Sequence, residues 1–255
     1  MNVDVDMTGW FVQFQSELDA LLSDMFQIRS ATEQKRYTGS QVNQAGIVGV
    51  VIPNAEALGE TAPRRAAQNA FIGAMSKFSG FLDRLIASRR IATDGIPVTR
   101  DLHTEAEVIQ YVSEIMEEIV ADVAHDPKLS VPKLDLFPGI DSNIKAMALN
   151  YNALRNALEH HHDLPKREIT VTIRRIVPMV GEQEITQFPV LVRKGETMSV
   201  KMIEVEKTFP ANQKVVLEPE DGHDLIFTVR HVIAPSIFQW HVGIGNPKSV
   251  SDPLP

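Results

Sequence analysis

A run of three histidines ends a polar segment that has the residue types needed to bind an anion. The segment spans residues 150–163 and contains Arg155, Asn156 and the histidines at 160–162. In the wider stretch 143–175, six basic residues stand against three acidic ones, a local charge of +3 in a chain whose net charge is −8. Positive charge concentrated in one region attracts anions. If the protein binds an anion, we expect this region to bind it.

This segment resembles the motif of the HEPN superfamily, the higher eukaryotes and prokaryotes nucleotide-binding domains. These domains are α-helical bundles in which a late helix carries an arginine, then a polar residue, and then a histidine after four to six intervening positions. Arg155, Asn156 and His160 match the pattern with four intervening residues. The residues leading to the motif are also similar to the family, namely Asn150, Tyr151 and Leu154. The resemblance covers residues 6–163, the helical part of the chain.

The resemblance implies a metal-independent endoribonuclease without a cofactor, often a homodimer in which the motifs of both subunits face each other. Arg155 would hold the phosphate through its forked guanidinium and stabilise the charge that develops on it. His160 would move protons to and from the 2′-hydroxyl and the leaving oxygen, because the pKa of histidine lies near neutrality. Asn156 would orient the phosphate or the imidazole, with Asn152 and His162 as further supporting residues. The expected products are a 2′,3′-cyclic phosphate and a 5′-hydroxyl.

The choice of the acting histidine stays open, because helix geometry and motif spacing favour different residues. At about 100° per residue, Arg155 and His160 lie roughly 140° apart on a straight helix, whereas Asn156 and His160 share a face. Arg155 and His162 are seven positions apart and nearly eclipse, and His162 also satisfies the family spacing. We expect His160 to act, since it has the tightest family spacing, with His162 as the geometric alternative.

Each residue of the motif also has an ordinary structural interpretation. Arg155 and Glu159 are four positions apart and could form a simple surface ion pair. Histidines in the last turn of a helix are favoured by the helix dipole and could cap its carbonyl groups. A metal site would need a further ligand from elsewhere in the chain, and nothing in the spacing selects one, so no functional metal is predicted. The available side chains are His125, His223, His231 and Asp163.

Apolar residues at three- and four-residue steps predict four helices up to the end of the motif. The third helix begins at Thr104, where Glu107 completes a capping box. A segment at 38–63 that is rich in glycine and proline separates the first predicted helix from the second. A linker at 127–138 with three prolines separates the third from the fourth. The apolar centre of the first segment, 47–52, could be a strand or a buried loop. The predicted helices span residues 6–36, 64–90, from 104 onward, and from 141–142 to 162–163.

The hydrophobic period changes after the motif. Residues 168–177 alternate and are β-branched, which predicts a strand. A turn at Gly181 leads to a partner strand at 184–192, and 198–205 and 214–217 are expected to be two further strands. Pro219 at the first position opens a closing helix. The predicted fold class is α+β: a four-helix, HEPN-like bundle over residues 1–163, a small antiparallel β-rich appendage with a closing helix over 164–240, and a flexible tail over 241–255.

Composition excludes several other classes. The chain has 255 residues and no cysteine, which excludes disulfide scaffolds, thiol catalysis and cysteine-ligated zinc. It has no glycine-rich phosphate loop after a strand, no G-x-S-x-G and no H-E-x-x-H. Its longest apolar run falls far short of the roughly 20 residues of a membrane helix, and the N-terminus lacks the features of a signal peptide. We therefore expect a cytoplasmic protein without membrane contact.

A second function from a different class fits the same fold. The net charge of −8 is unusual for a protein that binds RNA or a nucleotide. Residues 101–126 contain eight acidic side chains and no lysine or arginine. Such a helix is usually a solvated face, but it could dock a basic protein partner. The alternative is therefore a non-catalytic regulatory or protein-interaction module, for instance an antitoxin-like partner, that docks through the acidic helix or the β-rich region.

Overall fold

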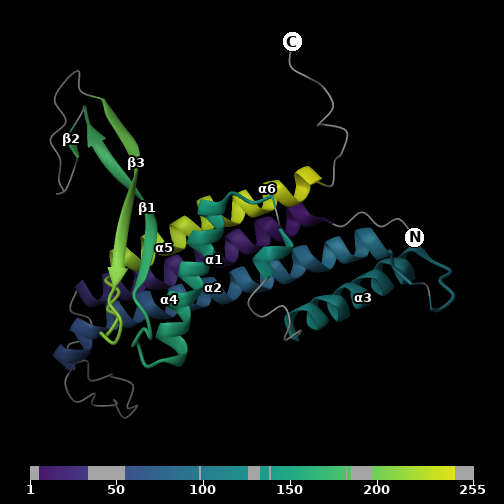
Figure 1. The fold of residues 1–255 in the computed structure, drawn as a ribbon, viewed down its shortest axis with the longest axis horizontal. Helices are drawn as coiled ribbons and strands as arrows, with labels where there is room; N and C mark the ends of the chain where they lie inside the picture. Colours follow the sequence, from purple (N-terminus) through teal and green to yellow (C-terminus); the bar gives the residue numbers. More distant parts are fainter. Residues whose placement is uncertain are drawn as a thin grey trace, which may run out of the picture.

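Long helices and one projecting antiparallel hairpin make up the described chain (Figure 1). The computed structural model describes residues 6–33, 55–97, 99–125, 133–137, 139–181, 183–184 and 197–244. The fold class is α+β and mostly helical, as predicted. The helical elements are α1 (Met7–Glu33), α2 (Ala55–Asp94), α3 (Glu105–His125), the 3₁₀ helix η1 (Lys133–Leu136), α4 (Ser142–His160), α5 (Pro219–Thr228), the π-helical η2 (Val229–Ile233) and α6 (Ala234–Ile244). The strands are β1 (Ile169–Val180), β2 (Gln183–Glu184) and β3 (Met198–Phe209).

The 40-residue helix α2 is the central element, since it contacts α1, α3, α4, α5, α6 and η1. It is longer than the predicted 64–90, because it also includes Gly59 and Pro63, which were expected to lie in a loose segment. Proline normally disfavours a helix interior. Packing of α2 against α1 and α5 outweighs this local preference. The apolar residues 47–52, for which strand and loop were both open, lie outside the described residues.

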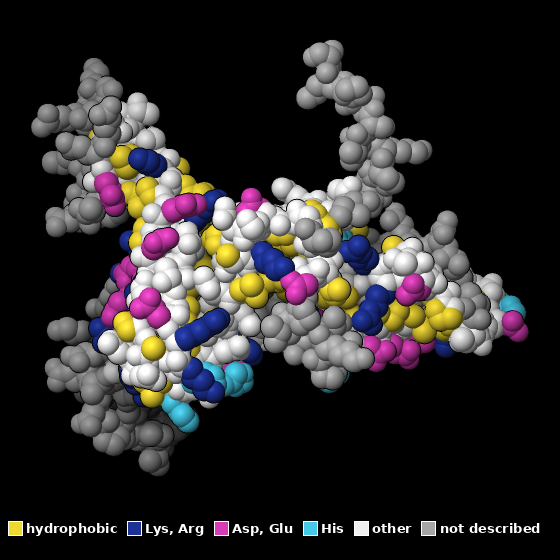
Figure 2. Space-filling model, in the orientation of Figure 1, with side chains coloured by type: hydrophobic (Ala, Val, Ile, Leu, Met, Phe, Trp, Pro, Cys, Tyr) yellow, Lys and Arg dark blue, Asp and Glu magenta, His cyan; other side chains and the backbone are white. Residues whose placement is uncertain are grey.

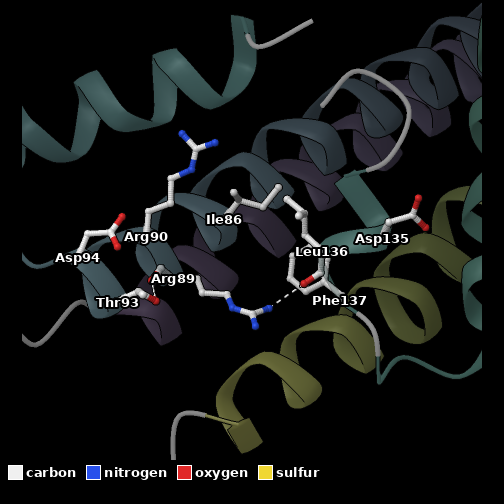
Figure 3. A pocket seen from close by; sticks show the side chains of 8 residues that line it. All are labelled: Ile86, Arg89, Arg90, Thr93, Asp94, Asp135, Leu136 and Phe137. Atoms are coloured by element: carbon white, nitrogen blue, oxygen red, sulfur yellow. Dashed lines mark hydrogen bonds between the residues drawn. The ribbon is translucent and has the colours of Figure 1, made fainter. Parts of the chain in front are cut away.

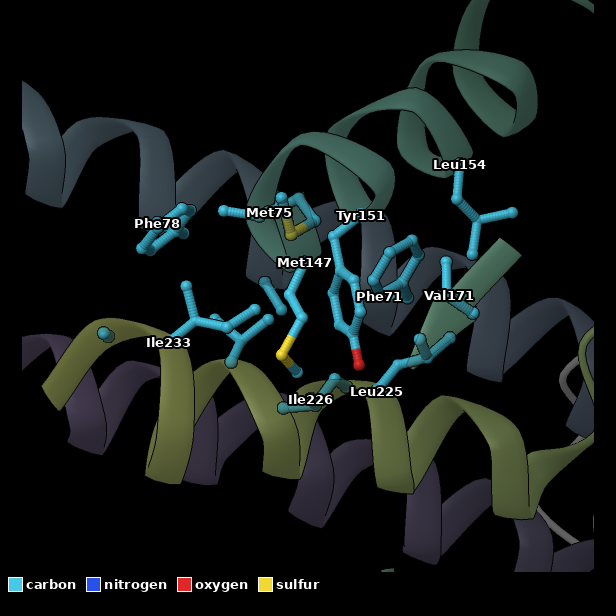
Figure 4. Close-up of a cluster of buried hydrophobic side chains, with 14 of the residues drawn as sticks. Phe71, Met75, Phe78, Met147, Tyr151, Leu154, Val171, Leu225, Ile226 and Ile233 are labelled. Carbon is cyan, nitrogen blue, oxygen red and sulfur yellow. The ribbon is translucent and has the colours of Figure 1, made fainter. Parts of the chain in front are cut away.

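One hydrophobic core joins α1, α2 and α4 to the sheet and the C-terminal helices (Figure 4). Tyr151 on α4 is fully buried at its centre and packs edge-on against Phe71 of α2, with ring centroids 6.0 Å apart. Its hydroxyl donates to the carbonyl of Thr172 on β1 at 3.0 Å, and burial raises the pKa of the phenol. Leu225 and Ile226 of α5 close the same cluster. The core therefore includes residues on both sides of position 163.

Helix α3 contributes Val123 to this core, but most of its apolar stripe packs elsewhere. Its apolar stripe forms a small second cluster with the C-terminal part of α2, in which Tyr111 and Met116 are buried. The predicted capping box is confirmed: Glu107 accepts from the backbone N–H of Thr104, and Thr104 accepts from the backbone N–H of Glu107. The backbone N–H groups of His103 and Thr104 both donate to the carboxylate of Glu107, and these hydrogen bonds lower its pKa. Helices α5 and α6 also belong to the main core, so the four predicted helices do not form a bundle of their own.

The hairpin is built by β1 and β3, which pair antiparallel along twelve residues from Ile169↔Phe209 to Val180↔Met198. The strand predicted at 198–205 is therefore confirmed and is longer. Of the partner strand predicted at 184–192, the described part is only β2, which pairs at Met179↔Glu184; residues 185–192 lie outside the description. The base of β1 packs on α4 and α5, and the distal half projects away from the helices (Figure 1).

The strand predicted at 214–217 is wrong. This segment has no regular secondary structure, and its backbone bonds to the loop after α4: the N–H of Val215 donates to the carbonyl of Asp163 at 2.8 Å. Val215 and Leu217 are buried in the core. Alternation alone could not distinguish such a buried connection from a strand.

The closing helix is confirmed and is longer than predicted. Pro219 occupies its first turn, and Glu218 and Asp221 form a capping box. The helix continues through η2 into α6, which ends at Ile244, so residues 241–244 of the predicted tail are helical. The remaining residues, 245–255, lie outside the described ranges. Within the described ranges, no helix is long and apolar enough to cross a membrane.

Two glycines provide a direct test of the α2–α5 contact. A Cβ at Gly222 of α5 would lie 2.7 Å from the Cβ and 3.1 Å from the Cα of Ala67 on α2, whereas a Cβ at Gly80 would meet nothing within 4 Å. We expect Gly222→Ala to lower the free energy of unfolding by about 1–3 kcal/mol through overpacking. Gly80→Ala should raise it by up to about 1 kcal/mol through helix propensity. Urea unfolding measures both, and equal effects of the two substitutions would contradict the close contact.

Candidate anion site at the end of α4

Helix α4 holds the motif on the outer side of the core. It begins after Asp141, whose side chain accepts from the backbone N–H of Asn143 at 2.7 Å. Tyr151, Leu154 and Leu158 bury one face against the core. Arg155 lies next to this face, only partly buried, and its position along the helix is fixed by the anchoring side chains. The motif thus lies in the last turns of a helix that is anchored to the core by its buried face.

The helix ends two to three residues earlier than predicted. The last helical residue is His160, and His161 is the C-cap. His162 and Asp163 follow with φ angles of 53° and 64°, in the left-handed region, so the chain turns away from the helix axis. The backbone N–H groups of His161 and Asp163 both donate to the carbonyl of Ala157, at 3.3 and 3.1 Å. This hydrogen bonding satisfies the helix end and stops the helix.

The early end changes the geometric argument about the histidines. His162 lies outside the helix, so it does not eclipse Arg155 as two residues seven apart on one helix would. Its side chain is exposed in the turn. The geometric reason for preferring His162 therefore does not hold, because helix spacing applies only to residues within the helix.

Arg155 and His160 converge on a single oxygen atom. Nη2 of Arg155 forms a short ion pair with Oε2 of Glu159, and Nε2 of His160 lies 3.5 Å from the same Oε2. The guanidinium also donates through Nη1 to Oδ1 of Asn156 at 3.1 Å. Although Arg155 and His160 are far apart around the helix, their long side chains meet at the carboxylate between them. Glu159 therefore brings the side chains of Arg155 and His160 together.

The exposure of these side chains increases toward the helix end. The side chain of Arg155 is 26% exposed, that of Glu159 34% and that of His160 55%. Nε of Arg155 is shielded from solvent, and no described residue accepts its hydrogen. Asn152, one turn before Asn156 on the same face, is exposed. The outer nitrogens of Arg155 are thus bonded to Glu159 and Asn156, and the imidazole of His160 is more than half exposed.

Basic residues surround the end of α4. Lys166 and Arg167 are exposed in the loop that leads to β1, and Lys214 lies 3.8 Å from Asp163. Figure 2 shows basic and histidine side chains together below the sheet, over the end of α4. In this region of a negatively charged protein, the local field favours anions.

A carboxylate oxygen held by a guanidinium and an imidazole occupies the position that an oxygen of a phosphate could take. Sequence reasoning treated Glu159 only as a possible ion-pair partner; its spacing of four from Arg155 was the available signal. A bound phosphate would have to displace this carboxylate. The arrangement is therefore a candidate anion site in which Glu159 pairs with the arginine that a phosphate would need.

The other histidines do not join this site. His125 lies at the end of α3, His223 on α5 and His231 on η2. Among the residues that the structure describes, no three histidine or acidic side chains are close enough together to hold a metal ion.

No protein-family model, no curated protein and no solved structure matches the chain. The resemblance to HEPN proteins consists of the motif residues and their placement at the end of α4.

Removing the charge of Glu159 should open the site to anions. We expect Glu159→Gln to tighten the binding of a labelled oligoribonucleotide about two- to fivefold at low salt, because a competing ion pair of this exposure is worth about 0.2–1 kcal/mol. The gain should shrink at high salt through screening. Fluorescence anisotropy measures the affinity.

The matched control is Glu114→Gln, which removes the same charge from the ion pair between Glu114 of α3 and Arg100 in the loop before it. Equal effects of the two substitutions would mean that only net charge matters and that Glu159 does not occupy an anion site.

Proposed function

We propose that the chain is a HEPN-like protein that binds RNA at the end of α4 and cleaves it without a metal ion, with Arg155 and His160 as the catalytic residues. The observation that carries the proposal is the convergence of Arg155 Nη2 and His160 Nε2 on one oxygen of Glu159. A phosphate that replaced this oxygen would be in contact with a permanent cation and with a group that can exchange protons.

Each side chain then has a distinct part in the reaction. The guanidinium of Arg155 binds the phosphate oxygens and stabilises the charge that develops as the 2′-oxygen attacks phosphorus. His160 accepts the proton of the 2′-hydroxyl as a general base. The 5′-oxygen leaves and takes up a proton, which gives a 2′,3′-cyclic phosphate and a 5′-hydroxyl. Asn156 keeps the guanidinium oriented through its Oδ1.

The reaction needs one group to accept a proton and another to donate one. One chain places a single motif histidine, His160, beside Arg155 at the end of α4. A homodimer with facing motifs would supply a second imidazole as the general acid. We therefore propose that the active form is a dimer.

Cleavage in excess EDTA tests the catalytic assignment. The wild-type protein should cut RNA to cyclic-phosphate ends, whereas Arg155→Ala/His160→Ala should not, since both the charge-stabilising group and the base are lost. The double variant should stay folded, with a loss below about 1 kcal/mol in urea unfolding, because a partly exposed ion pair contributes little.

Arg65→Ala/His125→Ala is the matched control, as it removes one exposed arginine and one exposed histidine elsewhere. It should cleave like the wild type. Equal cleavage by the wild type and by Arg155→Ala/His160→Ala would refute the assignment.

Light scattering tests the dimer. At micromolar concentration the protein should have twice the mass of one chain, because a composite site requires a closed two-fold assembly. A strict monomer that still cleaves RNA would contradict the facing-motif arrangement.

A second candidate function is favoured by the acidic helix. Glu105, Glu117, Glu118 and Asp122 are exposed on the outer face of α3, whose inner face packs on α2 and buries Val123 in the main core. Glu159 also compensates the charge of Arg155 when no ligand is bound. A regulatory module that docks a basic protein through α3 fits these observations. It becomes the leading function if the folded protein cleaves no RNA.

A further inference from the structure

A pocket of about 410 Å³ lies between the C-terminal part of α2 and the segment around η1 (Figure 3). This volume lies in the range of small-molecule sites, about 300–1,000 Å³. One side is apolar and is formed by Ile86, Leu136 and Phe137. The other lining residues are polar: Arg89, Arg90, Thr93, Asp94 and Asp135. None of these residues belongs to the α4 site.

Arg89 is held at the pocket by two contacts. Its Nη1 donates to the carbonyl of Leu136 at 2.7 Å, and its guanidinium carbon lies 5.8 Å from the ring centroid of Trp240. Figure 3 shows the guanidinium directed toward Leu136. An arginine has five N–H donors, so the fork can bind a planar anion while this contact persists. Its geometry is set before a ligand arrives.

The charges around the pocket favour an anion. Asp135 forms an ion pair with Lys145 of α4, which compensates its charge. Asp94, the last residue of α2, is the other acidic lining residue. Arg89 contacts a backbone carbonyl and an aromatic ring, and no described carboxylate forms an ion pair with it, so its positive charge is available to an anion.

We propose that this pocket binds a small organic carboxylate with an apolar body. The carboxylate contacts the guanidinium of Arg89, and the apolar body lies along Ile86, Leu136 and Phe137. A guanidinium and a carboxylate match as two parallel hydrogen bonds, which gives the site its preference for the acid. The apolar wall contributes through the area that it removes from water. The site is independent of the proposed RNA cleavage.

His241 of α6 provides a second readout at the same place. Its ring centroid lies 6.2 Å from that of Phe137, and its Nε2 is 3.0 Å from Oγ of Ser88. Burial and the nearby charge of Arg89 lower the pKa of His241. A carboxylate bound to Arg89 offsets that positive charge, so the pKa of His241 should rise when the pocket is occupied.

Calorimetric titration of the full chain with octanoate and with 1-octanol tests the proposal. The two probes share an apolar body and differ in charge. Octanoate should bind about tenfold or more tightly than octanol, as expected for a charge-assisted pair. Arg89→Gln should remove this preference, whereas Arg65→Gln, an exposed arginine at the other end of α2, should retain it.

Leu136→Ser is the second variant, since Leu136 is 36% exposed and its loss should weaken both probes without unfolding the chain. In NMR, octanoate should also raise the pKa of His241. Equal affinity for octanoate and octanol, or binding that survives both Arg89→Gln and Leu136→Ser, would overturn the proposal. So would the absence of saturable octanoate binding.

Discussion

The close approach of α5 to α2 at Gly222 and Ala67 sets the position of the elements built on it. Because glycine has no side chain, the two helices meet at van der Waals contact. Because Asp221 and Asp224 flank Gly222 on α5, this contact sets the position of their two buried carboxylates relative to α2. Lys207 of β3 pairs with the first of them.

The second carboxylate connects the helices to the hairpin. Nε of Arg175 on β1 lies 2.5 Å from Oδ2 of Asp224, and this hydrogen bond raises the pKa of Arg175. A buried carboxylate without such a partner would carry a large desolvation cost. The sheet is therefore held where its cations meet α5. β1 in turn accepts the hydroxyl of Tyr151, which orients α4 and leaves the motif face outward.

The local pattern was sufficient for most helices and for β1, because amphipathic spacing and alternation are properties of neighbouring residues. The local pattern was insufficient where contacts between residues far apart in the sequence determine the structure. Pro63 lies inside α2 because tertiary packing outweighs its local preference, and the segment around Val215 bonds to a loop instead of a strand. The place of α5 and α6 in the core likewise depends on partners that precede them by more than a hundred residues.

At the candidate site, too, some features followed from the sequence and others did not. The motif residues and their place at a helix end were predicted from the sequence. The convergence of Arg155 and His160 was not, since the helical angle between them suggested separation. The long side chains of Arg155 and Glu159 reach around the helix, so that the guanidinium and the imidazole both lie near the Glu159 carboxylate. A helical wheel shows only angles and leaves out side-chain length. The end of α4 at His160 is set by hydrogen bonds to Ala157, and periodicity does not include these.

The two left-handed residues after α4 also constrain how this sequence can diverge. Histidine, asparagine, aspartate and glycine tolerate a positive φ, whereas β-branched residues are strongly disfavoured there. His162 and Asp163 are both drawn from that small set. The turn after α4 therefore accepts few residue types at these two positions, and valine, isoleucine or threonine at either one would strain the backbone that leads toward β1.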